Sequence, residues 1–445
     1  MEPPGVTSIP ATAEPRLTRR GSAPAPKEFP LYYKVRSRKC LRAAWRVVYD
    51  NGTTSKSQDT RNDVKLFSFH AEQSIERLSR QLRQSKFQFP PSEGILQNRP
   101  GKRPRPIVKS PIDSRIVQRA LLDVLQDEPG IKPYYKNPTS FGGIKGEGLG
   151  VPGTIAGVYT AILNGRSHYI RSDIEGFFTA IPRKLVLEKI KAVITDSMFN
   201  ELLERATITE LENLASLGQD RRYFPLYEIG VAQGCCLSPL LGNILLEDFD
   251  KGMNGRGIVC IRYIDDFVIL GPKEGHVKAA FKSAQRILSK YGLNAYDPLI
   301  NKEKAEMGEV KHGLQFLGAE IRPGLITPSG KSTRRLIDSL GLIIEKSKKL
   351  MANPFELARK KRTVASTLKE MDNVVKGWGN QYSFCNNKDV MTHLDEQITE
   401  LTKHYFRFAR EARQSFSAEE YLANWRRLIG VHLLTDSKSD PIIRP

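Results

Sequence analysis

The sequence lacks the features that mark membrane, secreted and zinc-binding proteins. No apolar run reaches the roughly 18 residues that a membrane-spanning helix needs, and no apolar block near the N-terminus would make Arg19-Arg20 part of a secretion signal. The five cysteines include an adjacent pair, Cys235-Cys236, but no C-x-x-C motif, which argues against a zinc module and fits a reducing compartment. These absences predict a cytoplasmic protein with no membrane partner.

Acidic residues are in the minority. The chain of 445 residues has 69 Lys and Arg against 49 Asp and Glu, which leaves a formal net charge of +20. With 40% hydrophobic residues, the composition is that of a globular protein and not of a disordered one. A soluble protein of this charge usually binds a polyanion. The composition therefore predicts a nucleic-acid partner, but it does not separate DNA from RNA or a binder from an enzyme.

Two adjacent carboxylates, Asp265 and Asp266, lie between two short runs of β-branched and aromatic residues. Residues 258–261 lead in and residues 267–270 lead out, a pattern that predicts a β-hairpin with the acids at its tip. On its own, an Asp-Asp pair is more often an exposed turn. Side by side, however, the two acids repel each other unless a cation lies between them. Mg²⁺ prefers carboxylate and phosphate oxygens, so it is the expected partner.

A third acid, Asp173, ends a strand-like segment that begins at His168. Alone it would more often cap a helix. Combined with the Asp265-Asp266 pair it predicts phosphoryl or nucleotidyl transfer, because in-line displacement at phosphorus uses two metal ions held by a few carboxylates. Residues 148–153 match G-x-G-x-x-G upstream of Asp173, but we reject a dinucleotide site because no apolar strand precedes the glycines and Pro152 lies inside the turn.

Two further segments suit a phosphate-bearing substrate. Residues 101–109 form a strand-like stretch with four Lys or Arg side chains, which fits triphosphate or backbone phosphate as well as it fits a solvated edge strand. A helix is expected to follow from Arg115. Residues 230–239 form a loop that leads into an apolar helix expected from Leu240 to Phe249. A plain junction of loop and helix would need neither Gln233 nor Gly234.

The two ends of the chain differ in pattern. Residues 1 to about 30 are rich in Pro, Ala and Ser and predict a disordered arm. Residues 32–88 predict two helices joined by a polar loop from Asn51 to Asp63. From Thr333 onward the apolar spacing predicts further helices, whose outer faces carry basic side chains.

Together these segments resemble the polymerase core of bacterial reverse transcriptases of the group II intron-like and defence-associated type, over roughly residues 35–320. Asp173 with its following aromatics resembles the first palm motif, Gln233-Gly234 with Ser238-Pro239 the second, and Tyr263-Ile264-Asp265-Asp266 the third. Weaker similarities cover five more segments: the fingers segment at residues 101–120, the glycine stretch of group II intron-type enzymes at 139–143, the lysine-bearing fourth palm motif at 301–304, the primer-grip turn at 316–318 and the maturase-type thumb turn at 377–382.

The resemblance implies an α+β fold of right-hand architecture, in which the palm is an antiparallel sheet with helices and the C-terminal thumb is helical. The implied divisions are a basic, Pro-rich arm over 1–30, fingers with an N-terminal helical extension over 31–165, the palm over 166–325, and a thumb with an RNA-binding region like that of maturases over 326–445. No nuclease motif follows the expected thumb.

The resemblance also implies an RNA-directed DNA polymerase that uses two Mg²⁺ ions, with Mn²⁺ as an alternative. The implied metal ligands are Asp173, the carbonyl of Ile174, Asp265 and Asp266. The other implied site residues fall into three groups: nucleotide-binding Arg103, Arg105, Phe178, Gln233 and Lys304; primer- and template-binding Tyr263, Ile264 and Gly318; and RNA-binding Lys346, Lys348, Lys349, Arg359, Lys360, Lys361 and Arg362. Partners would be an RNA template or structured non-coding RNA, a DNA primer or product, and dNTPs.

Departures from the family pattern leave the biological role open. The second motif has Ala232 and Cys235 where Pro and Ser are usual, and Ile264 stands where group II enzymes have Ala. One interpretation is a defence enzyme that works with its own non-coding RNA; another is a group II intron maturase. A non-catalytic RNA-binding scaffold and an RNA-dependent RNA polymerase are less favoured alternatives. The template, the priming mode and the oligomeric state are not determined by the sequence.

Overall fold

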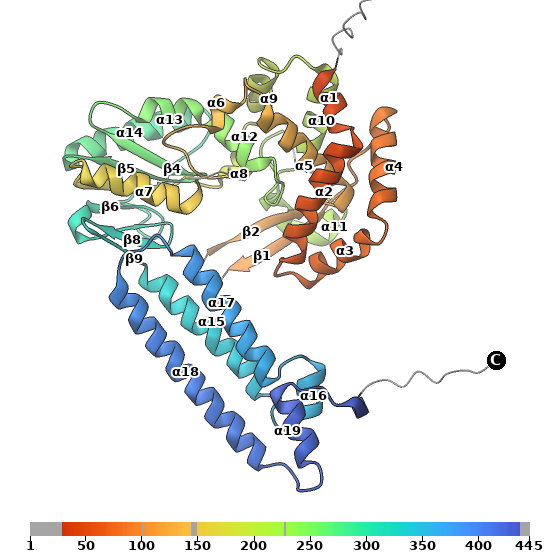
Figure 1. Ribbon diagram of the computed structural model, residues 1–445. Coiled ribbons are helices and arrows are strands. Elements are labelled where there is room, and N and C mark those ends of the chain that lie inside the picture. Colours follow the sequence, from red (N-terminus) through yellow and green to blue (C-terminus); the bar gives the residue numbers. More distant parts are fainter. Residues whose placement is uncertain (1–28, 100–101, 144–148, 227, 437–445) are drawn as a thin grey trace, which may run out of the picture.

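The computed structural model describes residues 29–99, 102–143, 149–226 and 228–436 (Figure 1). The predicted N-terminal arm, apart from its last two residues, lies outside the described residues. Figure 1 shows a body of sheets and packed helices from which the long C-terminal helices project to one side. Helices combined with antiparallel sheets confirm the predicted α+β class.

The centre of the body is a four-stranded antiparallel sheet in the order β4-β5-β3-β6, formed by β3 (His168–Asp173), β4 (Val259–Tyr263), β5 (Asp266–Gly271) and β6 (Glu306–Glu309). Four consecutive residues of β5, from Phe267 to Leu270, are fully buried. Successive strand side chains point to opposite faces, so both faces of this strand must be covered. Helix α14 (Glu274–Ser289) and helix α7 (Gly150–Leu163) provide the two covers.

The N-terminal part packs as helices around a β-hairpin. The hairpin pairs β1 (Glu93–Arg99) with β2 (Lys102–Lys109), as the basic strand-like stretch predicted. The helices are α1 (Pro30–Val35), α2 (Arg38–Thr53), α3 (Gln58–Ser68), α4 (Ala71–Arg83), α5 (Ile112–Asp127) and α6 (Lys132–Tyr135).

The predicted polar loop from Asn51 to Asp63 is wrong over most of its length. Helix α2 continues to Thr53, and α3 begins at Gln58 because the Ser57 side chain accepts a hydrogen bond from the Thr60 N–H. The apolar contact that fixes α3 involves Val64, which is fully buried against Gly52. Val64 is the one residue of α3 that is buried, and one buried position gives no periodic signal in the sequence.

Short helices occupy the stretch of chain between β3 and β4. They are α8 (Phe177–Ala180), α9 (Arg183–Lys191), α10 (Ser197–Thr207), α11 (Leu214–Leu217), α12 (Ser238–Leu245) and α13 (Glu247–Met253). We expected one helix from Leu240 to Phe249, and that expectation is wrong. The chain leaves the helical conformation at Leu246, with φ −87° and ψ 9°, and this residue both ends α12 and precedes α13.

A three-stranded antiparallel sheet joins the body to the C-terminal helices. It consists of β7 (Leu314–Phe316), β8 (Ala319–Arg322) and β9 (Leu325–Pro328). The predicted helices from Thr333 onward are present, and the first of them begins slightly earlier. They are α15 (Gly330–Lys348), α16 (Pro354–Arg359), α17 (Val364–Gln381), α18 (Lys388–Gln414) and α19 (Tyr421–Ile429). Their shared core includes Leu340, Met371 and the fully buried Tyr405.

Candidate active site

Three acidic residues meet at one end of the central sheet. Strand β3 pairs with β5 so that Asp173 lies directly opposite Asp266. Asp265 occupies the turn between β4 and β5, in which Tyr263 is paired with Asp266. The Ile174 N–H donates to the Asp265 carbonyl oxygen over 3.1 Å, which ties the end of β3 to this turn. The predicted hairpin with acids at its tip is therefore confirmed.

The electrostatics of this cluster favour a cation. Burial raises the pKa of Asp265 to about 7, and the neighbouring Asp173 and Asp266 contribute to this rise. Lys304 supplies one positive charge, since its Nζ lies 2.9 Å from Asp173 Oδ2. Burial alone would lower the pKa of Lys304, but the hydrogen bond to Asp173 and its charge leave this pKa raised. Crowded carboxylates with an ammonium beside them form a site that attracts positive charge.

The donor set fits a divalent metal ion only with help from a substrate. Within the described ranges, no cluster of three or more His, Cys, Asp or Glu side chains could hold a metal ion by itself. Mg²⁺ is usually held by one or two carboxylates together with substrate phosphates and water. The hard oxygens of Asp173, Asp265 and Asp266, with the Ile174 carbonyl, match that chemistry, and the Lys304 ammonium already marks a cation position on Asp173.

A cleft of about 820 Å³ opens beside the acids. It collects residues from six separate stretches of sequence, between Arg99 and Lys304. Its size and its composite lining are those expected of a ligand site. Of the residues predicted from sequence, those that line it are Arg105, Asp173, Ile174, Phe178, Gln233, Ile264, Asp265 and Lys304. The structure thus brings together four of the five nucleotide-binding candidates and two of the three acids.

Backbone hydrogen bonds join the segments that line the cleft. The Val108 N–H of β2 donates to the Gln233 carbonyl oxygen over 2.8 Å, and the Val231 N–H donates to the Phe178 carbonyl oxygen over 2.7 Å. Gly234 has a φ of 115°, and a Cβ there would lie 2.9 Å from the Val108 carbonyl oxygen. Glycine is therefore required where this loop passes β2.

Other predicted site residues lie away from this cleft or outside the described residues. Asp266 belongs to the acid cluster and Tyr263 is paired with it in the sheet, but neither residue lines the cleft. Gly318 lies in the turn between β7 and β8, where a Cβ would be 2.7 Å from the Tyr382 hydroxyl of the C-terminal helices. The side chain of Arg103 falls outside the described residues, whereas Arg105 is exposed at the cleft.

The predicted RNA-binding residues lie on α15, α16 and the segment that follows α16. Four of them are paired with acids: Lys348 with Glu345, Arg359 and Lys360 with Glu356, and Arg362 with Glu370. The remaining three are exposed or partly exposed: Lys346, Lys349 and Lys361. These three side chains have the freedom to reach phosphates, while the paired ones would have to exchange an acid for a phosphate.

Two features of the site were missed in the sequence. Tyr296 lies in an irregular segment, where its N–H donates to the Asp173 carbonyl and its own carbonyl accepts from Ser172. Nothing in the local pattern indicated this position. The second feature is Arg262, which is fully buried. Its place directly before Tyr263-Ile264-Asp265 is the signal in the sequence that could have indicated it.

The described part of the chain holds no helix that is both long enough and apolar enough to cross a membrane.

Comparison with known proteins identifies a domain. A family model described as "Reverse transcriptase (RNA-dependent DNA polymerase)" matches residues 97–321, which contain all three acids and the whole cleft. The "Uncharacterized 91 kDa protein in cob intron" of Schizosaccharomyces pombe is 28% identical over 178 residues, which cover 40% of this chain and 20% of that protein. "Protein YkfC" of Escherichia coli K12 is 23% identical over 187 residues, covering 34% of this chain and 46% of that one. The chain thus matches less than half the length of either relative.

Two solved structures also align with the chain. A chain of the "Partial Cas6-RT-Cas1--Cas2 complex" shares 20% identity with a TM-score of 0.34, over 59% of this chain and 43% of that chain. A chain of the "Cas6-RT-Cas1--Cas2 complex" gives the same identity and TM-score over 59% of this chain and 27% of that chain. At this level of similarity, neither alignment supports an argument about function.

Proposed function

This chain belongs to the family of reverse transcriptases (RNA-dependent DNA polymerases), and we propose that it copies RNA into DNA with Asp173, Asp265 and Asp266. The matched domain is that of an RNA-directed DNA polymerase, a nucleotidyltransferase. The observation that carries the proposal is the register of the central sheet, which sets Asp173 opposite Asp266 with Asp265 in the adjoining turn. A polymerase site needs carboxylates gathered in this way.

Polymerases of this family work with divalent metal ions, a nucleic-acid template and dNTPs. We assign the metal to Mg²⁺, two ions at a time, with Mn²⁺ as the alternative. Asp173, Asp265, Asp266 and the Ile174 carbonyl would hold these ions. When bound, the ions would lower the pKa of the primer 3′-hydroxyl and neutralise charge on the triphosphate.

The remaining cleft residues would bind and orient the nucleotide. Arg105, with Arg103, would contact the triphosphate, and Gln233 would contact the incoming nucleotide. Phe178 would lie against the sugar and exclude a 2′-hydroxyl. Lys304 would hold a proton on Nζ within reach of the departing pyrophosphate. Their shared position around one cleft supports these roles for the four residues that line it.

The primer and the template RNA would extend from the cleft across the C-terminal helices. In this proposal residues 31–165 are the fingers, 166–325 the palm and 326–445 the thumb, with Tyr263, Ile264 and Gly318 near the primer. Lys346, Lys349 and Lys361, together with their paired neighbours, would bind RNA phosphates. The contact between Gly318 and Tyr382 links the expected primer grip directly to the thumb.

We further propose that the enzyme works with its own structured non-coding RNA in antiphage defence. The departures in the two motifs support this role. Cys235 replaces the Ser usual in the family and Ile264 replaces the Ala usual in group II enzymes, and both residues line the cleft. Cleft residues that differ from those enzymes fit a different template or product.

The second candidate is a group II intron maturase that assists splicing and retrohoming. A relative named for its position in a cob intron favours this alternative. The segment from Gly377 to Tyr382, which resembles a maturase thumb turn, also favours it. Both roles use the same polymerase chemistry, so the bound RNA is what separates them.

The test is to express the protein with its flanking genomic DNA, purify it and sequence the RNA that co-purifies. Copying of that RNA into DNA is then compared between the wild type and the Asp265→Ala/Asp266→Ala variant. A discrete non-coding RNA copied only by the wild type supports defence, whereas intron RNA supports the maturase. If RNA binds and both proteins are equally inert with Mg²⁺ and with Mn²⁺, the protein is an RNA-binding scaffold and the proposal fails.

A further inference from the structure

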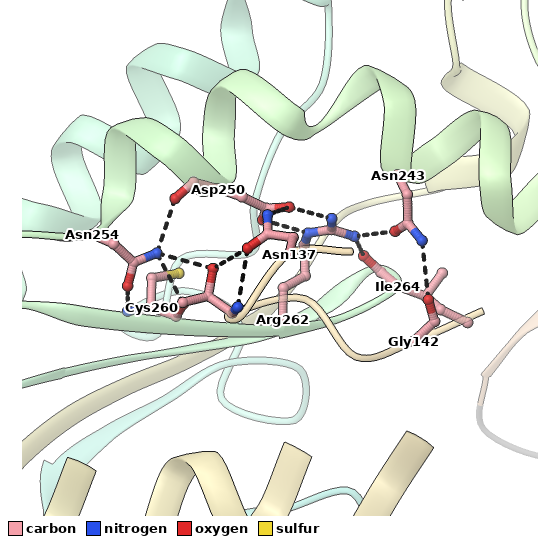
Figure 2. A network of polar contacts seen from close by, with 9 residues as sticks. Asn137, Gly142, Asn243, Asp250, Asn254, Cys260, Arg262 and Ile264 are labelled. Carbon is pink, nitrogen blue, oxygen red and sulfur yellow. Dashed lines mark hydrogen bonds and ion pairs between the residues drawn. The ribbon is translucent and has the colours of Figure 1, made fainter. Parts of the chain in front are cut away.

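Arg262 is fully buried in β4, two residues before the turn that carries Asp265. Its Nε donates to Asp250 Oδ1 over 2.7 Å and its Nη2 to Asp250 Oδ2 over 2.5 Å (Figure 2). Asp250 is only 3% exposed, so the whole ion pair is shielded from water. A pair of this kind fixes the orientation of the guanidinium plane, because two of its nitrogens bind the two carboxylate oxygens at once.

The third nitrogen of the guanidinium reaches the turn itself. Arg262 Nη1 donates to the Ile264 carbonyl oxygen over 2.9 Å and to Asn243 Oδ1 over 2.9 Å. Figure 2 shows the guanidinium between Asp250 on one side and Asn243 and Ile264 on the other. One side chain thus connects α12 and α13 to the backbone immediately before Asp265.

The backbone that receives this hydrogen bond is strained. Ile264 has a φ of 62°, in the left-handed region that a β-branched residue rarely adopts. Such a conformation persists only where the surroundings hold it, and it is concentrated at functional sites. The Arg262 side chain is one of the groups that hold it.

The segment from Asn137 to Gly142 also contacts the turn and the ion pair. The Asn243 Nδ2 donates to the Gly142 carbonyl oxygen over 3.0 Å, and a Cβ on Gly142 would lie 2.6 Å from the Ile264 backbone nitrogen. Asn137 Nδ2 donates to Asp250 Oδ2 over 3.0 Å, and the Arg262 N–H donates to the Thr139 carbonyl. Four stretches of chain therefore converge on the conformation of one residue.

Stability alone does not account for this network. A buried ion pair can often be replaced by apolar side chains of similar volume without loss of stability. An apolar pair could not donate to the Ile264 carbonyl, so the left-handed turn would lose its support. The turn therefore requires the hydrogen bond that Arg262 donates to the Ile264 carbonyl oxygen.

We propose that Arg262, held by Asp250 and Asn243, is a positioning residue that fixes the left-handed turn at Ile264 and so the direction in which Asp265 presents its carboxylate toward Asp173. This inference rests on the proposed function, because the direction of the Asp265 carboxylate matters only if Asp265 belongs to the polymerase site. Arg262 touches neither the nucleotide cleft nor the reacting atoms, and it acts through the backbone of Ile264.

The test compares Arg262→Lys with Arg427→Lys, which breaks a similar bidentate pair with Asp436 near the far end of the C-terminal helices. Lysine keeps the charge but not the fork. We expect Arg262→Lys to lower kcat about 10- to 100-fold, the loss typical of a slightly misplaced reacting group, with a smaller change in KM for dNTP. Arg427→Lys should keep the wild-type kcat.

The double variant Arg262→Met/Asp250→Leu separates positioning from stability. We expect it to unfold near the wild-type temperature and still to have a low kcat. A double variant with wild-type stability and wild-type kcat would overturn the proposal. If either variant fails to fold, Asn243→Ala gives the same test, because it removes hydrogen bonds to Arg262 and Gly142 while leaving the ion pair intact.

Binding of Mn²⁺, followed by electron paramagnetic resonance with dNTP present but without primer or template, gives a readout that does not depend on polymerisation. Asp265→Asn serves as the reference for a damaged site. We expect Arg262→Lys to weaken Mn²⁺ binding about tenfold at a temperature where both proteins are folded, in line with the effect of residues that orient metal ligands. Unchanged Mn²⁺ affinity would contradict positioning. If the wild type copies no RNA, the proposed function fails, and the Mn²⁺ comparison still decides the role of Arg262.

Discussion

Lys304 Nζ lies 2.9 Å from a carboxylate oxygen of Asp173, although the two residues are 131 positions apart in the chain. Its ammonium also lies over the ring of Tyr296, 5.3 Å from the centroid. Positive charge is therefore already present at the acid cluster without a metal ion. A divalent cation that binds Asp173 would compete with this pair, and that competition can be measured.

Substitution of Lys304 should lower both the Mg²⁺ concentration needed for half-maximal activity and the maximal rate. We expect Lys304→Gln to reach half-maximal activity at a lower Mg²⁺ concentration, because Asp173 loses its ammonium partner. The maximal rate should fall about 100-fold or more if Lys304 protonates the pyrophosphate, the range typical of general acids. A Mg²⁺ titration of dNTP incorporation measures both quantities. Lys302→Gln, an exposed neighbour, is the matched control, and an unchanged Mg²⁺ requirement in Lys304→Gln would argue against competition.

Phe178 should set the choice between deoxyribonucleotides and ribonucleotides. Phe178→Val removes the aromatic face from the cleft, so a 2′-hydroxyl would fit. We expect discrimination against rNTPs to fall about tenfold or more, a usual effect of enlarging an apolar contact, while KM for dNTP changes less. Incorporation of dCTP and CTP opposite one template G gives the ratio. If the ratio stays at its wild-type value, Phe178 is not the steric gate.

Gly142 should tolerate no side chain. Gly142→Ala places a Cβ 2.6 Å from the Ile264 nitrogen, a backbone atom that cannot move away without shifting the turn. We expect a loss of about 1–3 kcal/mol in unfolding free energy, the usual cost of overpacking, together with reduced activity. Gly341→Ala in α15 is the control, since a Cβ there meets nothing within 4 Å. That helical substitution should be neutral or stabilising by about 0.5–1 kcal/mol, and equal effects of the two substitutions would show that the turn is not tightly packed.

The unpaired lysines of the predicted RNA-binding surface should contribute to RNA affinity through charge. Replacing Lys346, Lys349 and Lys361 by Gln should weaken RNA binding for every sequence and reduce the salt slope by about one unit for each phosphate that the variant no longer binds. Binding is measured across a series of KCl concentrations. A triple variant of Lys278, Lys376 and Lys403, each paired with an acid, carries the same charge change and should keep the wild-type slope. Identical slopes in the two triple variants would mean that net charge, and not this surface, governs binding.

The sequence predicted those parts of the site that depend on local pattern. Alternating β-branched residues indicated the hairpin that carries Asp265, and the strand that ends at Asp173 was equally visible. Local spacing was sufficient for these two features. The pairing of β3 with β5, which sets Asp173 opposite Asp266, was not part of the prediction and comes from the structure.

The missing features depend on contacts between distant segments. Helix α3 is fixed by Val64 against Gly52, and the interruption at Leu246 lies between Asn243 and Asp250, both of which turn toward Arg262. No periodicity marks the partner of a single buried residue. The pairs Arg262–Asp250 and Lys304–Asp173 could not be predicted either. Charged residues usually remain in water, so nothing in the sequence indicated that these side chains would pair inside the protein.

The measurement that tests the central claim most directly is single-nucleotide extension of a primer on an RNA template with Mg²⁺. Wild type, Asp265→Asn and Asp248→Asn are compared, since Asp248 is an acid on α13 that pairs with Lys189. We predict that Asp265→Asn extends the primer at least about 100-fold more slowly than the wild type, as expected for loss of an essential charge-stabilising group, while Asp248→Asn stays close to the wild-type rate. Equal rates for the wild type and Asp265→Asn would contradict the assignment of these acids as the polymerase site.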